Sequence, residues 1–112
     1  MNNDESLELA NNTTRTTRCT YLMDSGTTSH MTPCRNDLDE YRDDKRGLIA
    51  FGDDSTVEFR GSGSIGNKFD DTLYVPDLKT GLISISMLDE KGYKTVFYNG
   101  RCKVFDENNN LY

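Results

Sequence analysis

The stretch that decides the fold lies near the start of the chain and reads Tyr21-Leu22-Met23-Asp24-Ser25-Gly26-Thr27-Thr28. Its first three residues are apolar and predict a short, buried β-strand that runs directly into Asp24. The residues after Asp24 are a glycine and small hydroxylated residues, which are typical of a tight turn. The sequence thus predicts a carboxylate carried by a buried strand into a turn.

An aspartate in such a turn can activate water if a second aspartate lies beside it. Two carboxylates about 3 Å apart cannot both ionise, so they share a proton and their apparent pKa values separate. The ionised carboxylate deprotonates a bound water while the protonated one polarises the scissile carbonyl. Gly26 permits close backbone approach, and the hydroxyls of Ser25 and Thr27 can donate to a carboxylate. We therefore predict Asp24 as a catalytic residue of an aspartic protease that uses neither a metal nor an organic cofactor.

The chemistry needs two such turns, and the chain supplies one. Asp54 and Asp71 are each followed by a hydroxylated residue, but neither has a glycine next in sequence. If Asp24 is catalytic, the second carboxylate must come from a second copy of the chain. The predicted enzyme is therefore a homodimer with an isologous interface.

The remainder of the sequence predicts short strands separated by turn residues, and one short helix. Asn99-Gly100 is the strongest hairpin signal, and a polar tip at Gly52-Asp53-Asp54-Ser55 joins two further strands. The predicted elements are a hairpin over 48–59 with its second strand continued through Gly61, Gly63 and Gly66, strands at 72–75 and 82–85, a helix over 86–91 with Ser86 as its N-cap and Gly92 as its stop, and a hairpin over 93–105. This pattern predicts an all-β domain, closed or nearly closed, with one short helix.

Composition divides the chain into three parts. Residues 1–18 are rich in Asn, Thr, Asp and Glu and predict a flexible leader, because they hold too few apolar side chains to offset the entropy of ordering. The folded domain is expected over 19–106, followed by a loose polar tail over 107–112. Within the domain, the charged segment 35–46 is expected to be a loop with at most one helical turn.

The charge pattern limits the partners. The net charge is −6 and the 13 Lys and Arg residues are scattered, so no nucleic-acid partner is expected for this domain. The sequence shows no apolar run of membrane-spanning length and no signal-peptide pattern, which predicts an intracellular, cytoplasmic protein without a membrane partner. The three cysteines, Cys19, Cys34 and Cys102, do not resemble the disulfide framework of a secreted domain.

Four segments in order resemble the protease region of copia-type retrotransposon polyproteins. The first is residues 21–32, in which Asp24-Ser25-Gly26 is followed by a hydroxyl-rich stretch and His30-Met31. The other three are residues 51–56, residues 74–78, and Leu82-Ile83-Ser84-Ile85-Ser86-Met87-Leu88 with Lys91-Gly92-Tyr93 after it. Together they place the resemblance over residues 21–105.

The resemblance implies a retropepsin-like closed β-barrel with one lobe per chain, acting on peptide segments of its own polyprotein within virus-like particles. Asp24 would be catalytic, and Ser25 would brace the two active-site loops against each other. The implied flap consists of Phe51, Gly52, Asp53, Asp54 and Ser55, and Leu82-Ile83-Ser84 would form the strand beside the active-site loop. Thr27 and Ser84 depart from the Ala and Gly that retroviral relatives usually carry.

The sequence also allows other interpretations. The fold could persist without catalysis, as a domesticated dimerisation or peptide-binding module. Residues 24–29 have the spacing of a phosphorylation-dependent degron, although the buried strand before them argues against exposure. The segment 61–66 matches a dinucleotide-binding fingerprint but is not followed by an apolar helix. Cys19, His30, Cys34 and Cys102 could bind zinc but lack a Cys-x-x-Cys knuckle, and His30 is more readily a structural residue of the turn.

Overall fold

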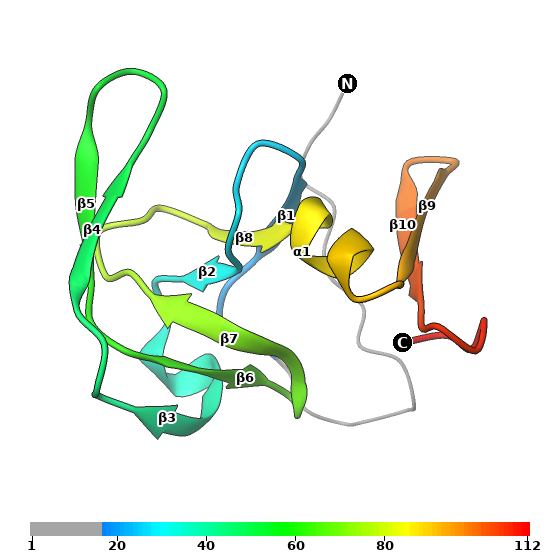
Figure 1. The fold of residues 1–112 in the computed structure, drawn as a ribbon, viewed down its shortest axis with the longest axis horizontal. Coiled ribbons are helices and arrows are strands. Elements are labelled where there is room, and N and C mark those ends of the chain that lie inside the picture. Colours follow the sequence, from blue (N-terminus) through cyan, green and yellow to red (C-terminus); the bar gives the residue numbers. More distant parts are fainter. Residues whose placement is uncertain (1–16) are drawn as a thin grey trace.

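The computed structural model describes residues 17–112, and this part of the chain is mostly β-structure with one short α-helix, as predicted (Figure 1). The predicted leader lies outside the described residues except for Thr17 and Arg18. The elements are β1 (Tyr21–Asp24), β2 (Met31–Thr32), the 3₁₀-helix η1 (Arg35–Asp37), β3 (Leu38–Arg42), β4 (Gly47–Ala50), β5 (Thr56–Phe59), β6 (Ser62–Ile65), β7 (Lys68–Tyr74), β8 (Gly81–Ser84), α1 (Ile85–Glu90), β9 (Lys94–Tyr98) and β10 (Arg101–Phe105).

Six strands form the main sheet in the order β1-β8-β2-β7-β6-β3. The strands β1 and β8 are parallel, as are β2 and β7, whereas the other neighbours are antiparallel. Within residues 17–112 the two end strands do not pair, so the predicted closed barrel is not found. The hairpins β4–β5 and β9–β10 stay outside this sheet as separate two-stranded sheets. The strand β10 still reaches the core through Val104, whereas β4, β5 and β9 expose at least every second residue, Leu48 and Tyr98 among them.

The strand β3 corrects the prediction of a loop over 35–46. Its backbone pairs with β6, with Leu38 opposite Ile65 and Arg42 opposite Ser62. Leu38 is 5% exposed and belongs to the core. One buried side chain and a neighbouring strand outweigh the polar composition of this segment, because strand formation depends on context more than on intrinsic preference.

The core combines side chains of the main sheet with Leu88 of α1 and Val104 of β10. Tyr21 is its central polar anchor, since its ring is buried while its hydroxyl donates to the Asp37 carboxylate at 2.8 Å and lies 2.8 Å from the Thr32 hydroxyl. A Cβ on Gly81 would collide with the Tyr21 ring, so glycine is required where β8 crosses it. The buried apolar cluster consists of Tyr21, Leu38, Ile65, Phe69, Ile83, Leu88 and Val104.

The helix α1 begins one residue earlier than predicted, and its N-cap is Ser84, not Ser86. The Ser84 hydroxyl accepts a hydrogen bond from the backbone N–H of Met87 at 3.1 Å. Such a bond satisfies one of the four free N–H groups of a helix start. The predicted stop is confirmed, because Gly92 has a φ of +80° directly after the last turn.

The tail over 107–112 is docked, which contradicts the prediction of a loose end. Tyr112 donates its backbone N–H to the carbonyl of Val104 at 2.7 Å, and its hydroxyl accepts from the N–H of Phe69 at 2.9 Å. Its ring packs edge-on against Phe69 and is tilted at 45° against the ring of Tyr93. Tyr112 thereby packs against the core at Phe69, and burial raises the pKa of the Tyr112 hydroxyl to about 12.

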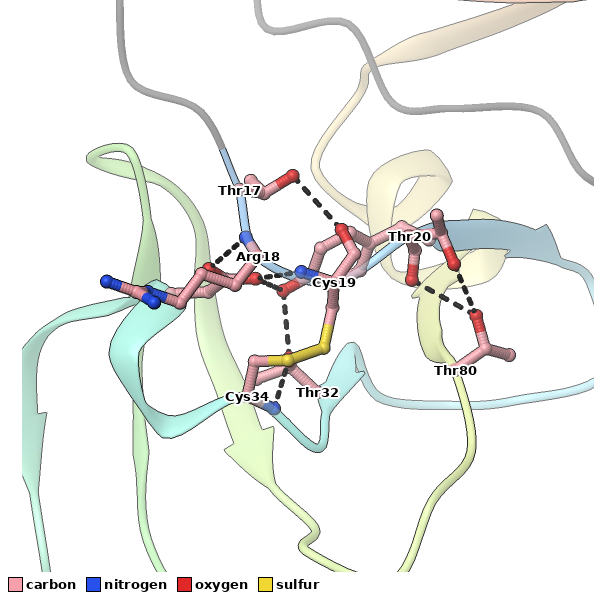
Figure 2. Close-up of a disulfide and its surroundings, with 9 residues drawn as sticks. Thr17, Arg18, Cys19, Thr20, Thr32, Cys34 and Thr80 are labelled. Carbon is pink, nitrogen blue, oxygen red and sulfur yellow. Dashed lines mark hydrogen bonds between the residues drawn. A yellow bond between two sulfur atoms is a disulfide. The ribbon is translucent and has the colours of Figure 1, made fainter.

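Two cysteines are joined, although the sequence did not suggest a disulfide framework. Cys19 and Cys34 form a disulfide whose Cα atoms lie 6.1 Å apart (Figure 2). Cys102 lies on β10, outside this bond. No helix in the described part of the chain combines the length and apolar character needed to cross a membrane.

Candidate active site

Asp24 is the last residue of β1, and β8 holds this strand along its whole length. The register places Asp24 opposite Ser84 and Met23 opposite Ile83. Because the two strands are parallel, their carboxyl ends meet at one edge of the sheet, where the chain leaves β1 for a turn and leaves β8 for α1. The predicted strand Leu82-Ile83-Ser84 therefore lies directly beside the Asp24-Ser25-Gly26 turn.

The turn presents the Asp24 carboxylate at the surface. Asp24 is half-buried, whereas Ser25 and Gly26 are exposed. The backbone N–H of Gly26 donates to Oδ1 of Asp24, two residues earlier in the chain, at 2.6 Å. This bond holds the orientation of the carboxylate within the turn. A Cβ at Gly26 would lie 3.1 Å from that oxygen, so a larger residue would crowd it. Glycine thus lets the backbone approach the carboxylate.

The second half of the turn is fastened to the start of α1. The carbonyl of Thr27 accepts hydrogen bonds from the hydroxyls of Ser84 at 2.7 Å and Ser86 at 3.2 Å. The single hydroxyl of Ser84 therefore makes both bonds: it donates to the carbonyl of Thr27 in the turn and accepts from the backbone N–H of Met87 in the helix. The hydroxyl of Thr27 is buried and has no hydrogen-bond partner among residues 17–112.

His30 lies on the buried side of the loop that follows the turn. Its side chain is fully buried, and its Nδ1 accepts from the backbone N–H of Ser84 at 2.9 Å. Because Nδ1 is the acceptor, the ring must be neutral with its proton on Nε2. Burial, with a smaller effect from Lys91, lowers the pKa of His30 from 6.5 to about 4, which favours this neutral form. His30 thus links the loop after the turn to Ser84, while its buried Nε2 has no hydrogen-bond partner among residues 17–112.

The predicted flap residues form the loop of the β4–β5 hairpin, which projects from the sheet (Figure 1). The backbone N–H of Phe51 donates to the carbonyl of Ser55 at 2.9 Å, and that of Asp54 donates back to the carbonyl of Phe51 at 3.1 Å. Ser55 donates both its hydroxyl and its backbone N–H to the Asp53 carboxylate, which lowers the pKa of Asp53. Within residues 17–112 no hydrogen bond or ion pair links this loop to the Asp24 turn.

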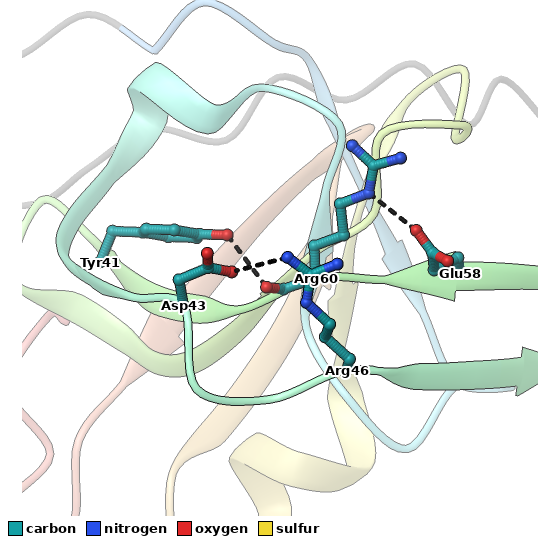
Figure 3. Close-up of polar contacts among 5 residues, drawn as sticks. All are labelled: Tyr41, Asp43, Arg46, Glu58 and Arg60. Atoms are coloured by element: carbon teal, nitrogen blue, oxygen red, sulfur yellow. Dashed lines mark hydrogen bonds and ion pairs between the residues drawn. The ribbon is translucent and has the colours of Figure 1, made fainter.

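The base of that hairpin carries a set of polar contacts (Figure 3). The Tyr41 hydroxyl on β3 donates to the carbonyl of Arg60 at 3.2 Å. Arg60 also pairs with Glu58 at 2.7 Å, and Arg46 lies 3.7 Å from Asp43. The ion pairs are exposed and add little stability. The Tyr41 bond attaches the residue directly after β5 to β3 of the main sheet and so fixes the base of the hairpin.

A hollow of about 420 Å³ lies next to the turn. It is lined by Ser25 of the turn, by three residues of α1 and by the segment after the helix: Ile85, Ser86, Asp89, Tyr93, Lys94 and Thr95. This hollow could not be predicted from the sequence, because its lining residues come from segments about 60 residues apart in the chain.

The structure groups a different set of possible metal ligands from the one weighed in the sequence. Among the described residues, ligand atoms of Cys19, Cys34 and Asp37 lie within 4.8 Å of one another, and neither His30 nor Cys102 belongs to this group. The two sulfur atoms are bonded to each other, and the Asp37 carboxylate accepts from the N–H groups of residues 18 and 19 and from Tyr21. These bonds occupy the ligand atoms in this state.

The fold and site define a class of small mostly-β domains in which a parallel strand pair presents an Asp-Ser-Gly turn at the sheet edge. Residues 21–93 match the family model described as Pol polyprotein, beta-barrel domain. The chain belongs to this family and is a domain of a retrotransposon Pol polyprotein. No curated protein matches the chain.

Proposed function

We propose that this domain is the aspartic endopeptidase of its Pol polyprotein, a retropepsin-like lobe that acts as a homodimer inside the cell, within virus-like particles. Asp24 of each copy supplies one of the two carboxylates, and the pair shares a proton. Water is the nucleophile, and no covalent intermediate forms. The substrates are peptide segments of the same polyprotein.

The observation that carries the proposal is the placement of Asp24 at the carboxyl end of β1, opposite Ser84 of β8. This position leaves the carboxylate at the surface, oriented by the N–H of Gly26. The turn behind it is fastened by Ser84, Ser86 and His30. A catalytic group must be both accessible and held in place, since it has to contact the substrate in a fixed orientation.

The hairpin loop 51–55 suits the role of a flap. It extends away from the sheet, its tip is exposed, and its base is attached through Tyr41 and Arg60. A loop with a fixed base and a mobile tip can close over an extended peptide and exclude water from the carboxylate pair. The carboxylates of Asp53 and Asp54 make this loop acidic, so basic substrate side chains near it would be favoured.

The experiment is to express the Pol polyprotein with its own protease region and to follow its processing. Asp24→Asn keeps the size of the side chain and removes the charge, so processing should stop, with a rate loss of at least about 10³-fold, of the size seen when a catalytic group is removed. Asp44→Asn, an exposed aspartate on the loop before β4, is the matched control and should process normally.

Two further measurements distinguish an active protease from a non-catalytic binding module. The purified domain should sediment as a dimer at the concentrations at which it cleaves peptides, because a monomer holds half of the carboxylate pair. Processing that continues in Asp24→Asn would refute the catalytic assignment. A dimer that binds polyprotein peptides without cleaving them would instead support the non-catalytic module.

A further inference from the structure

The Cys19–Cys34 disulfide encloses the candidate catalytic turn. The two cysteines are 15 residues apart in sequence, and the segment between them contains all of β1, the Asp24-Ser25-Gly26 turn, His30 and β2. Cys19 lies two residues before the start of β1, and Cys34 directly precedes η1. The covalent bond therefore ties together the two ends of the loop that carries Asp24 (Figure 2).

A second fastening lies at the same place and does not depend on the sulfur atoms. The Asp37 carboxylate is 1% exposed and accepts from the backbone N–H groups of Arg18 at 2.6 Å and Cys19 at 3.0 Å. The Tyr21 hydroxyl donates to it as well. With these three hydrogen bonds, the carboxylate keeps the entry into β1 in place. Loss of the disulfide would thus loosen the loop without releasing β1.

The far end of the loop also has hydrogen bonds of its own. The hydroxyl of Thr32 accepts from the N–H of Cys34 at 3.0 Å, and the carbonyl of Thr32 accepts from Val75 at 2.8 Å. At the near end, the N–H of Gly81 donates to the carbonyl of Thr20 at 3.0 Å. Both ends therefore keep hydrogen bonds that do not depend on the sulfur atoms, so reduction would loosen the segment between them without unfolding the sheet.

We propose that the Cys19–Cys34 pair is a thiol–disulfide exchange site that controls the order of the Asp24 turn, with a dithiol as its reactant. Both cysteines are half-buried, so part of each residue is open to solvent, from which a thiolate would approach. The oxidised pair holds residues 19–34 closed, and the reduced pair leaves the turn more mobile. The consequence for catalysis rests on the proposed function, whereas the consequence for mobility does not.

The exchange is balanced in atoms and electrons. One thiolate of the dithiol attacks Sγ of Cys19 or Cys34, the Sγ–Sγ bond breaks, and a mixed disulfide forms. The second thiolate of the dithiol then attacks the mixed disulfide and releases the protein sulfur. The protein gains two thiols, and the dithiol is oxidised to its own disulfide. The reverse reaction needs an oxidised dithiol or another disulfide as the oxidant.

The first experiment counts thiols and measures mobility in the whole domain, with dithiothreitol as the dithiol. Under native conditions N-ethylmaleimide should leave Cys19 and Cys34 unlabelled before reduction and should label both after it. Hydrogen exchange should then accelerate at least about tenfold in peptides covering residues 21–34, whereas residues 94–105 should keep their protection. Labelling of Cys19 or Cys34 without reductant would overturn the proposal. So would unchanged exchange over 21–34, or an equal loss over the whole chain.

Variants make the assignment specific. In Cys19→Ser/Cys34→Ser, exchange over 21–34 should be fast with or without dithiothreitol, and the melting temperature should lie roughly 10–20 °C below that of the oxidised protein. Cys102→Ser is the matched control and should keep the full response to dithiothreitol. A reductant response that survives in the double variant, or that disappears in Cys102→Ser, would contradict the assignment.

The second experiment measures peptide cleavage in both redox states. We expect reduction to slow cleavage several-fold in the wild type and in Cys102→Ser, but not in the double variant. If no cleavage occurs in either state, the proposed function fails, while labelling and hydrogen exchange still decide the redox site. If cleavage occurs at equal rates while exchange responds, control of catalysis is refuted and the enzyme assignment stands.

Discussion

Acidification should destabilise this domain through its single histidine. His30 accepts the N–H of Ser84 with Nδ1, and protonation of that nitrogen would remove the acceptor and place a charge in the core. Burial, followed by the charge of Lys91, lowers the pKa of His30 from 6.5 to about 4, while Asp71 opposes this shift weakly. Between these two values the unfolded chain binds more protons than the folded chain, so stability must fall as the pH falls.

The magnitude follows from the two pKa values. A change from 6.5 to about 4, at 1.36 kcal/mol per pH unit, corresponds to about 3 kcal/mol of unfolding free energy. This contribution is fully present above pH 6.5, and about 2 kcal/mol of it is lost between pH 7 and pH 5, where aspartates and glutamates are still ionised. The loss is a large share of the stability of a small domain.

Urea unfolding followed by tyrosine fluorescence at pH 7, 6 and 5 measures this loss. The matched variant is His30→Asn, whose side-chain oxygen can accept near the position of Nδ1 without titrating. It should be less stable overall because it loses the ring packed against Phe69, but its stability should change little over this range. The reasoning is refuted if the variant shows the wild-type slope, or if an NMR titration gives His30 a pKa near 6.5.

Three substitutions test the packing of the fold by thermal unfolding. Tyr112→Phe keeps the ring but removes the acceptor of the Phe69 N–H, so it should cost about 1 kcal/mol, and an unchanged melting temperature would mean that the tail bond contributes nothing. Gly81→Ala introduces a Cβ into the Tyr21 ring and should cost about 1–3 kcal/mol. Gly52→Ala is its control, because a Cβ there meets nothing within 4 Å, and its effect should stay within about 0.5 kcal/mol.

Features set by neighbouring residues could be predicted from the sequence. Asn99 and Gly100 have φ values of +51° and +72°, which is the conformation that a two-residue hairpin turn requires and that these residue types adopt readily. The strand before Asp24 and the hairpin around Asp53 could also be predicted, because their signals are the residue types of adjacent positions. The end of α1 followed from Gly92. In each case the decisive interaction lies within a few residues.

Features set by distant partners could not be predicted. The strand β3 exists because β6 pairs with it, and Tyr112 docks because Phe69 offers both a ring and an N–H. Ser84 was predicted as a strand residue, and its function as helix cap and brace of the turn became visible only when Thr27 and His30 were placed beside it. The pattern of apolar residues predicts which segments are buried, but it does not predict which other segments they pack or pair with.

The arrangement around Asp24 bears on how the proposed dimer would work. The turn is fastened within one chain by His30 and Ser84 at its end, and by the disulfide and Asp37 at the base of the loop. A half-site that is ordered before association loses less conformational entropy when two copies meet, and more of the contact free energy then appears as affinity. The same reasoning predicts that loosening the loop by reduction weakens dimerisation as well as catalysis. In the proposed enzyme, the bonds that hold Asp24 in one chain would therefore also set how readily it meets the second carboxylate.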